Sequence, residues 1–99
     1  MIQRIVLAKL TDDLSNPVGR AEAVRHTREV FATIPGPLGF EVGAPADEAA
    51  IASWDLCILV RFASLSDVAA YGQDPTHRAY VDGWLTPNTV VKKAWNFEI

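Results

Sequence analysis

The stretch SWDLCILVRF, residues 53–62, decides the fold of this 99-residue chain. Its β-branched and long aliphatic residues predict a strand. Cys57 and Leu59 would lie on one face of that strand, and both are apolar. The other face is apolar as well, and would carry Trp54, Leu56, Ile58, Val60 and Phe62. Since neither face suits contact with water, we expect this strand at the centre of a sheet that is covered on both sides.

The N-terminal third predicts a second strand of this kind, followed by a helix. Residues 2–10, IQRIVLAKL, place Ile5 and Leu7 on one strand face and apolar side chains also on the other. Ser15 or Asn16, followed by Pro17, is typical of a helix start. The apolar residues that follow recur at helical spacing from residue 18 to about residue 34. PGPLG, residues 35–39, ends this amphipathic helix.

The rest of the chain repeats the scheme. We expect a short strand at 40–43, a polar loop at 44–50 (APADEAA), and then the strand at 53–62. Ser64 and Asp67 resemble a capping box and predict a helix to about Tyr71. Asp74-Pro75 predicts a further helical segment to about residue 85, and TPN (86–88) ends it. The last strand is VVKKAWNFEI, residues 90–99.

The order β-α-β-β-α-β predicts an α+β fold over residues 1–99 as a single domain. Two such split units give the ferredoxin-like architecture, a four-stranded antiparallel sheet with helices on one face. The chain has helices for only one of the two apolar faces. We therefore expect a second copy to pack sheet to sheet in an isologous homodimer, a dimeric α+β barrel. Alternatively, Ile5, Leu7 and Leu59 are scattered surface aliphatic residues.

Composition argues against several classes of partner and site. A formal net charge of −3 gives no electrostatic reason to expect nucleic acid. No apolar run approaches the ~20 residues of a membrane span, and MIQRIVLAKL is not expected to be a signal peptide. One cysteine, Cys57, cannot form an internal disulfide, which favours a cytoplasmic protein. Two isolated histidines and one cysteine lack the spacing of metal ligands, and no glycine-rich phosphate loop is present, so no cofactor is expected.

The segment YGQDPTHRAY, residues 71–80, carries the candidate chemistry. The imidazole of His77 changes charge near neutral pH and is suited to removing a proton next to a carbonyl group. The hydroxyl of Tyr71 would donate a hydrogen bond to the developing enolate. A structural interpretation stands beside this one, in which His77 satisfies a helix end and Tyr71 belongs to the core. Asp74 is interpreted as a helix N-cap rather than an acid.

A pocket between sheet and helices would surround these two residues. Arg4 shares a strand face with Val6 and Ala8, and its fork of donors suits a carboxylate or an enolate. The remaining lining is expected from Val6, Ala8, Phe31, Ile58, Val60, Tyr80 and Trp84. His26 is expected to be solvated beside Arg25 and Arg28, and Cys57 to be a packing residue.

Five segments together resemble the stress-responsive α/β-barrel (Dabb) family over almost the whole chain. They are IVLAKL, IPGPLGFEVG, DLCILVRF, LSDVAAYGQDPTHRAYV and the ending NFEI. The resemblance implies a dimeric α+β barrel. The family's Y-x-x-H-P-x-H pattern is present from Tyr71 to His77, with Asp74 in place of the first histidine. Its D-F-E ending begins here with Asn96.

The resemblance also implies a range of functions. One plant member is a polyketide cyclase that needs no cofactor, and related barrels include cofactor-independent oxygenases and ligand-binding proteins. Tyr71 and His77 match the cyclase's working pair, whereas Arg4 and Leu56 stand where it has two further histidines. Three hypotheses follow: a dimer that binds a small apolar or weakly acidic molecule; a cofactor-independent cyclase, lyase or oxygenase acting on a polyketide-like or aromatic substrate; and a structural protein whose barrel is filled by its own side chains.

Overall fold

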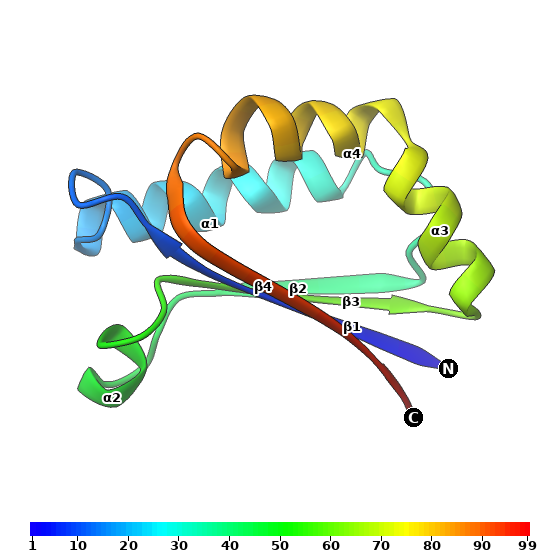
Figure 1. The fold of residues 1–99 in the computed structure, drawn as a ribbon, viewed down its shortest axis with the longest axis horizontal. Coiled ribbons are helices and arrows are strands. Elements are labelled where there is room, and N and C mark those ends of the chain that lie inside the picture. Colours follow the sequence, from blue (N-terminus) through cyan, green and yellow to red (C-terminus); the bar gives the residue numbers. More distant parts are fainter.

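The computed structural model describes all residues, 1–99, and contains one antiparallel sheet. Its strands are β1 (Ile2–Leu10), β2 (Gly39–Gly43), β3 (Leu56–Phe62) and β4 (Thr89–Glu98). They lie in the order β2-β3-β1-β4, so the two strands with two apolar faces are central. The predicted α+β fold with a four-stranded antiparallel sheet is confirmed (Figure 1).

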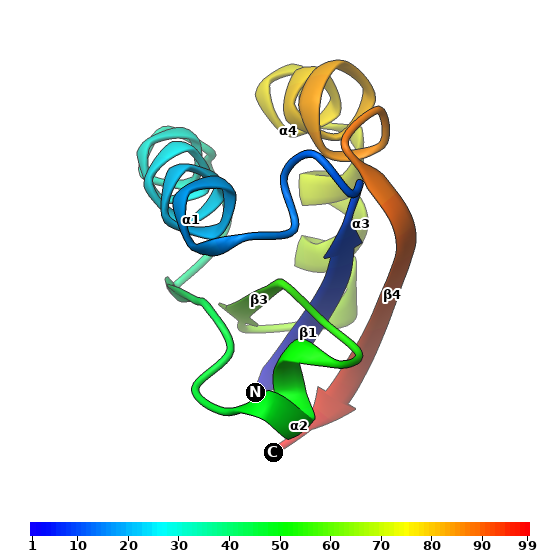
Figure 2. The ribbon, with the colours of Figure 1, turned by 90° about the vertical axis from the view of Figure 1, so that its left-hand side faces the viewer.

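The main helices lie on one face of this sheet. They are α1 (Pro17–Phe31), α3 (Leu65–Gln73) and α4 (Pro75–Tyr80), and α4 continues into a single π-helical turn, η1 (Val81–Leu85). Figures 1 and 2 show α1 and α4 on the same side of the sheet, with α3 turned down toward one end of it. A hydrogen bond of 2.7 Å between the hydroxyls of Thr27 and Tyr80 joins α1 to α4.

Local capping residues start the helices where the sequence predicts. Asn16 accepts a hydrogen bond from the backbone N–H of Gly19 at 2.8 Å, so it caps α1. Ser64 caps α3 by accepting from the N–H of Asp67 at 3.3 Å. Asp74 caps α4 by accepting from the N–H groups of Thr76 and His77 at 2.9 and 3.2 Å. Each cap satisfies donors that the first helical turn leaves free.

Three local predictions need correction. The expected polar loop at 44–50 contains the start of a one-turn helix, α2 (Glu48–Ile51), which Asp47 caps. The long helix ends at Phe31 rather than near residue 34, and Gly36 turns the chain with a φ of 110°. β3 begins at Leu56, so Trp54 precedes the strand instead of sharing its face. Between them lies Asp55, whose buried carboxylate pairs with Arg20.

The core lies between the sheet and the helices. Leu56, Ile58, Val60 and Phe62 on β3 are all buried, as are Ala8 and Leu10 on β1. α1 contributes Ala23 and Phe31 to the same core, and the C-terminal helices contribute Tyr71, Tyr80 and Leu85. None of the helices has the length and hydropathy to cross a bilayer.

The opposite face of the sheet, called here the outer face, carries no helix in Figure 1 apart from α2 near one end. The strand register pairs Ile5 with Leu59 and Leu7 with Cys57, which places these four side chains together on that face. On the edge strand β4, Trp95 is 45% exposed and Phe97 is 53% exposed. The centre of the outer face is therefore apolar, as the alternation of residues in β1 and β3 indicates, while Gln3, Arg61 and Lys93 lie around it.

Candidate functional site

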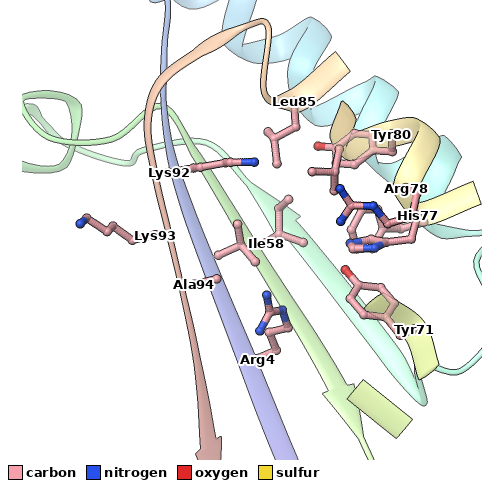
Figure 3. Close-up of a pocket in the computed structure, with 13 residues that line it drawn as sticks. Arg4, Ile58, Tyr71, His77, Arg78, Tyr80, Leu85, Lys92, Lys93 and Ala94 are labelled. Atoms are coloured by element: carbon pink, nitrogen blue, oxygen red, sulfur yellow. The ribbon is translucent and has the colours of Figure 1, made fainter. Parts of the chain in front are cut away.

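A pocket of about 270 Å³ lies between the α4–η1 segment and the edge strand β4, above β1 and β3 (Figure 3). Its apolar wall consists of Val6, Phe31, Ile58, Tyr80, Val81 and Leu85. Its polar groups are Arg4, Tyr71, His77, Arg78 and Lys92, and Lys93 and Ala94 of β4 complete the lining. A mainly apolar cavity with a few convergent polar groups is the usual form of a small-molecule site.

His77 and Tyr71 are packed together in this pocket. Their ring centroids are 3.9 Å apart, and both side chains are buried. Tyr71 lies in the last turn of α3 and His77 in the first turn of α4, so the Asp74 cap between the two helices fixes their relative position. The Nδ1 atom of His77 is buried and has no hydrogen-bond partner within the protein. In Figure 3 the imidazole and the Tyr71 hydroxyl are directed toward the gap that separates them from Arg4.

The surroundings keep both groups neutral near pH 7. Burial lowers the pKa of His77 below its ordinary value, and the charges of Arg78 and Arg4 lower it further, against smaller opposing effects of the Gly72 backbone and Asp74. Burial also raises the pKa of Tyr71, although the charge of Arg4 acts in the opposite direction. His77 is thus an uncharged acceptor or donor, and Tyr71 retains its proton for donation.

Arg4 lies on the floor of the pocket without an acidic partner. Its Nη1 atom donates to the side-chain oxygen of Asn96 on β4 at 3.0 Å. Its Nε atom is buried and has no partner within the protein. The Nε donor of Arg4 is therefore unsatisfied within the protein.

An aromatic cluster supports the pocket from the helix side. Tyr80 stacks on Trp84 with ring centroids 5.6 Å apart, and Trp84 lies 5.0 Å from the ring of His26. His26 is therefore half-buried in an aromatic contact and not solvated as expected, because η1 brings Trp84 against α1. Burial raises the pKa of Tyr80 to about 12, so its hydroxyl stays protonated and bonded to Thr27.

The structure brings seven of the ten expected site residues to the pocket: Arg4, Val6, Phe31, Ile58, Tyr71, His77 and Tyr80. Ala8 and Val60 have no exposed surface and lie within the core. Trp84 packs behind Tyr80 rather than lining the pocket. The expected space for a ligand beside Ala8 is therefore not found, because Ala8 is fully buried and does not line the pocket.

Sequence reasoning missed Arg78, Val81, Leu85, Lys92 and Ala94. Val81 and Leu85 follow His77 at steps of four residues, a spacing that places side chains on one face of a helix. Lys92 and Ala94 alternate on β4, and their pairing with Ala8 and Val6 turns them toward the helices. The helical spacing of Val81 and Leu85 can be read from the sequence, whereas the pairing of Lys92 and Ala94 with β1 cannot. No three His, Cys, Asp or Glu side chains lie close enough together to hold a metal ion.

The fold resembles several solved structures. A Dabb family protein with a ferredoxin-like fold from Mesorhizobium loti aligns with a TM-score of 0.82 at 16% identity, covering 99% of this chain and 95% of that one. A dimeric ferredoxin-like protein of unknown function from Thermobifida fusca aligns with a TM-score of 0.80 at 24% identity, covering 99% and 90%. The hydroxynitrile lyase from Passiflora edulis aligns with a TM-score of 0.77 at 13% identity, covering 99% and 92%.

The sequence itself gives a more specific assignment. A search of the curated proteins found no significant match. The family model described as the Stress Responsive A/B Barrel Domain, however, matches residues 2–91, which is nearly the whole chain. The prediction from the sequence motifs is thereby confirmed: the chain belongs to the stress responsive A/B barrel domain (Dabb) family.

Proposed function

We propose that this chain is a single Dabb domain that forms a homodimer and binds a small apolar or weakly acidic molecule in the pocket between sheet and helices. The observation that carries the proposal is the buried, unpartnered Nδ1 atom of His77 in a cavity of about 270 Å³. Leaving a buried polar atom without a partner costs roughly 1–3 kcal/mol. A shift of the imidazole that brought Nδ1 to a ligand oxygen in the cavity would remove that cost, while the apolar wall would cover the ligand's hydrocarbon part.

The outer face supports the dimer. Ile5, Leu7, Cys57 and Leu59 form an apolar surface that the chain's own main helices do not cover. Contiguous apolar surfaces of this kind usually mark an interface. The Thermobifida fusca structure is described as dimeric, and a neighbour from Bacteroides fragilis, 25% identical with a TM-score of 0.75, is also described as dimeric. A cytoplasmic location, which rests on the lone cysteine, is part of the same proposal.

Ligand binding can be tested by thermal shift with a panel of single-ring acids, phenols and their neutral analogues. We expect at least one class to raise the melting temperature, because a ligand that binds only the folded state stabilises it. Ala94→Phe would insert a ring into the pocket from the exposed strand β4 and should abolish the shift.

The matched control is Ala49→Phe. Ala49 is exposed on α2, which does not line the pocket, so this variant should keep the full shift. If no compound in the panel stabilises the wild type, the pocket is not a binding site for this class. The structural hypothesis, in which the domain has no ligand, would then be favoured.

The arrangement of His77 and Tyr71 favours a second candidate, a cofactor-independent lyase or cyclase. A neutral imidazole next to a protonated phenol provides a base and a hydrogen-bond donor in one small site. A lyase, the Passiflora edulis enzyme, is built on this fold. In hydroxynitrile cleavage the base would take the hydroxyl proton while the carbon–carbon bond to the nitrile breaks, which releases an aldehyde and cyanide.

Turnover of benzaldehyde cyanohydrin, a single-ring hydroxynitrile, tests this candidate. We expect His77→Gln to reduce turnover about 100-fold, the lower range of general-base effects. Because the pKa of His77 is lowered, its neutral form persists on acidification below the ordinary value of 6.5. The wild-type rate should therefore stay level from pH 8 to 6.5 and fall only below that. Absence of wild-type turnover, or an undiminished rate in His77→Gln, contradicts the lyase hypothesis.

A further inference from the structure

The pocket reverses the charge balance of the chain. The chain has 12 acidic and 9 basic side chains, for a net charge of −3. No acidic residue lines the pocket, whereas four basic residues do: Arg4, Arg78, Lys92 and Lys93. A cavity with low-dielectric walls and charges of one sign attracts ligands of the opposite sign. The pocket is therefore a local anion-attracting site on an acidic protein.

The side chain of Lys93 points away from the pocket in Figure 3, and two of the other three cations are not neutralised by an acid. Lys92 donates to the hydroxyl of Thr86 at 2.6 Å, and Arg4 donates to the amide oxygen of Asn96 at 3.0 Å. Both partners are uncharged. Arg78 is paired with Asp82 through one nitrogen at 2.5 Å, which leaves its other N–H groups for a further acceptor. The pocket thus retains net positive charge.

The cations enter the pocket from separate elements. In Figure 3, Lys92 extends from β4 and Arg78 lies across the gap on α4, with the apolar Leu85 and Ile58 nearby. His77 is 91% buried, and its unpartnered Nδ1 atom is a second, independent polar group in the same cavity. A ligand with an apolar body and one acidic group would contact both kinds of surface.

The volume limits the size of that ligand. An apolar cavity of about 150 Å³ accepts benzene. The pocket, at about 270 Å³, is therefore large enough for one ring with a short substituent.

We propose that the pocket selects single-ring carboxylic acids in their ionised form, and that Lys92 and Arg78 determine this specificity by binding the carboxylate. The inference rests on the proposed binding function and adds the ligand's charge and size. The ring would pack against Ile58 and Leu85, on the apolar wall of the pocket.

Calorimetric titration with sodium benzoate and with benzamide, its uncharged analogue of nearly the same shape, tests the inference. We expect benzoate to bind at least about tenfold more tightly, since hydrogen bonds to charged groups contribute ~1.5–3 kcal/mol. The preference should weaken between 0.05 and 0.5 M NaCl, because Lys92 is exposed and its charge is screened. Lys92→Met keeps the aliphatic stem and should reduce benzoate affinity about tenfold while leaving benzamide unchanged.

Lys93→Met is the matched control. Lys93 is the next residue on β4 and borders the gap, but its pairing with Leu7 and its direction in Figure 3 place its side chain on the outer face. The charge change is identical, so an equal loss in both variants would mean a general field effect and would overturn the role of Lys92. Equal affinity for benzoate and benzamide would overturn acid selectivity but leave the proposed binding function standing. Binding of neither probe, together with no thermal shift from the wider panel, would overturn both.

Discussion

At the scale of single residues, Asp55 is the most tightly held polar group of the chain although it belongs to no recognisable motif. Its carboxylate is fully buried and accepts hydrogen bonds from the Leu10 amide at 2.8 Å, the Arg20 guanidinium at 2.8 Å and the Ser15 hydroxyl at 2.9 Å. Lys9 lies 3.5 Å away. Burial by itself raises the pKa of Asp55, but these partners outweigh it and bring the pKa below its ordinary value.

We expect Asp55→Asn to reduce the free energy of unfolding by about 3 kcal/mol, because Arg20 and Lys9 lose their counter-charge. Chemical denaturation at pH 7 measures the change, with Asp12→Asn, an exposed acid, as control. The folded pKa of Asp55 is lowered, so its stabilisation is present above about pH 4 and is lost as the pH falls through the folded pKa. The difference between wild type and variant should therefore shrink below pH 4. If the difference in the free energy of unfolding stayed constant below pH 4, Asp55 would not stabilise the fold as an ionised carboxylate.

At the scale of helices and strands, the sequence predicted the features that depend only on neighbouring residues in the chain. Helix starts depend on a capping side chain and the next three residues, and Asn16, Ser64 and Asp74 cap as their sequences indicate. Other features have no such signal. β3 begins one residue after Asp55, whose partner Arg20 is distant in the chain, and the π-helical turn η1 is closed by a hydrogen bond from the N–H of Thr86 to the carbonyl oxygen of Val81 at 2.9 Å. Neither has a local signature, so neither was predictable.

The first turn of α1 depends on a close backbone approach at Gly19. A Cβ atom on Gly19 would lie 2.0 Å from the carbonyl oxygen of Leu14, which belongs to the backbone and has little freedom to move. Gly19→Ala should therefore destabilise the protein by about 2–3 kcal/mol, measured by urea denaturation.

Gly72→Ala is the control for that change. Gly72 lies in α3, and nothing would meet its added Cβ within 4 Å. This substitution should stabilise the protein by about 0.5–1 kcal/mol, because alanine loses less backbone entropy than glycine in a helix. Equal effects of the two substitutions would show that the Leu14 contact is unimportant.

At the scale of the whole molecule, strand register decides which side chains meet, and register explains what sequence reasoning could and could not find. The pairing of Tyr71 with His77 was predictable because they are only six positions apart, with one helix cap between them. Lys92 joins the pocket only because β4 pairs with β1, which sets it beside Ala8 and on the same face as Arg4. No periodicity within β4 determines which face meets the helices. The apolar outer face was predictable, since the two central strands show it independently.

The outer face also provides the sharpest test of the proposed dimer. Leu59 lies on the central strand β3 directly opposite Ile5, so Leu59→Arg would place a charge in the middle of a sheet-to-sheet interface. Burying an unpaired charge there is costly. We expect the wild type to sediment as two chains at micromolar concentration in sedimentation equilibrium, and the variant to dissociate. Leu65→Arg makes the same change at a leucine of α3 that is 60% exposed, and should leave the dimer intact.

A wild type that sediments as one chain, or a Leu59→Arg variant that remains dimeric, would mean that this face is not the interface. Far-UV circular dichroism of both variants distinguishes dissociation from unfolding, because a dissociated but folded monomer keeps its helical signal.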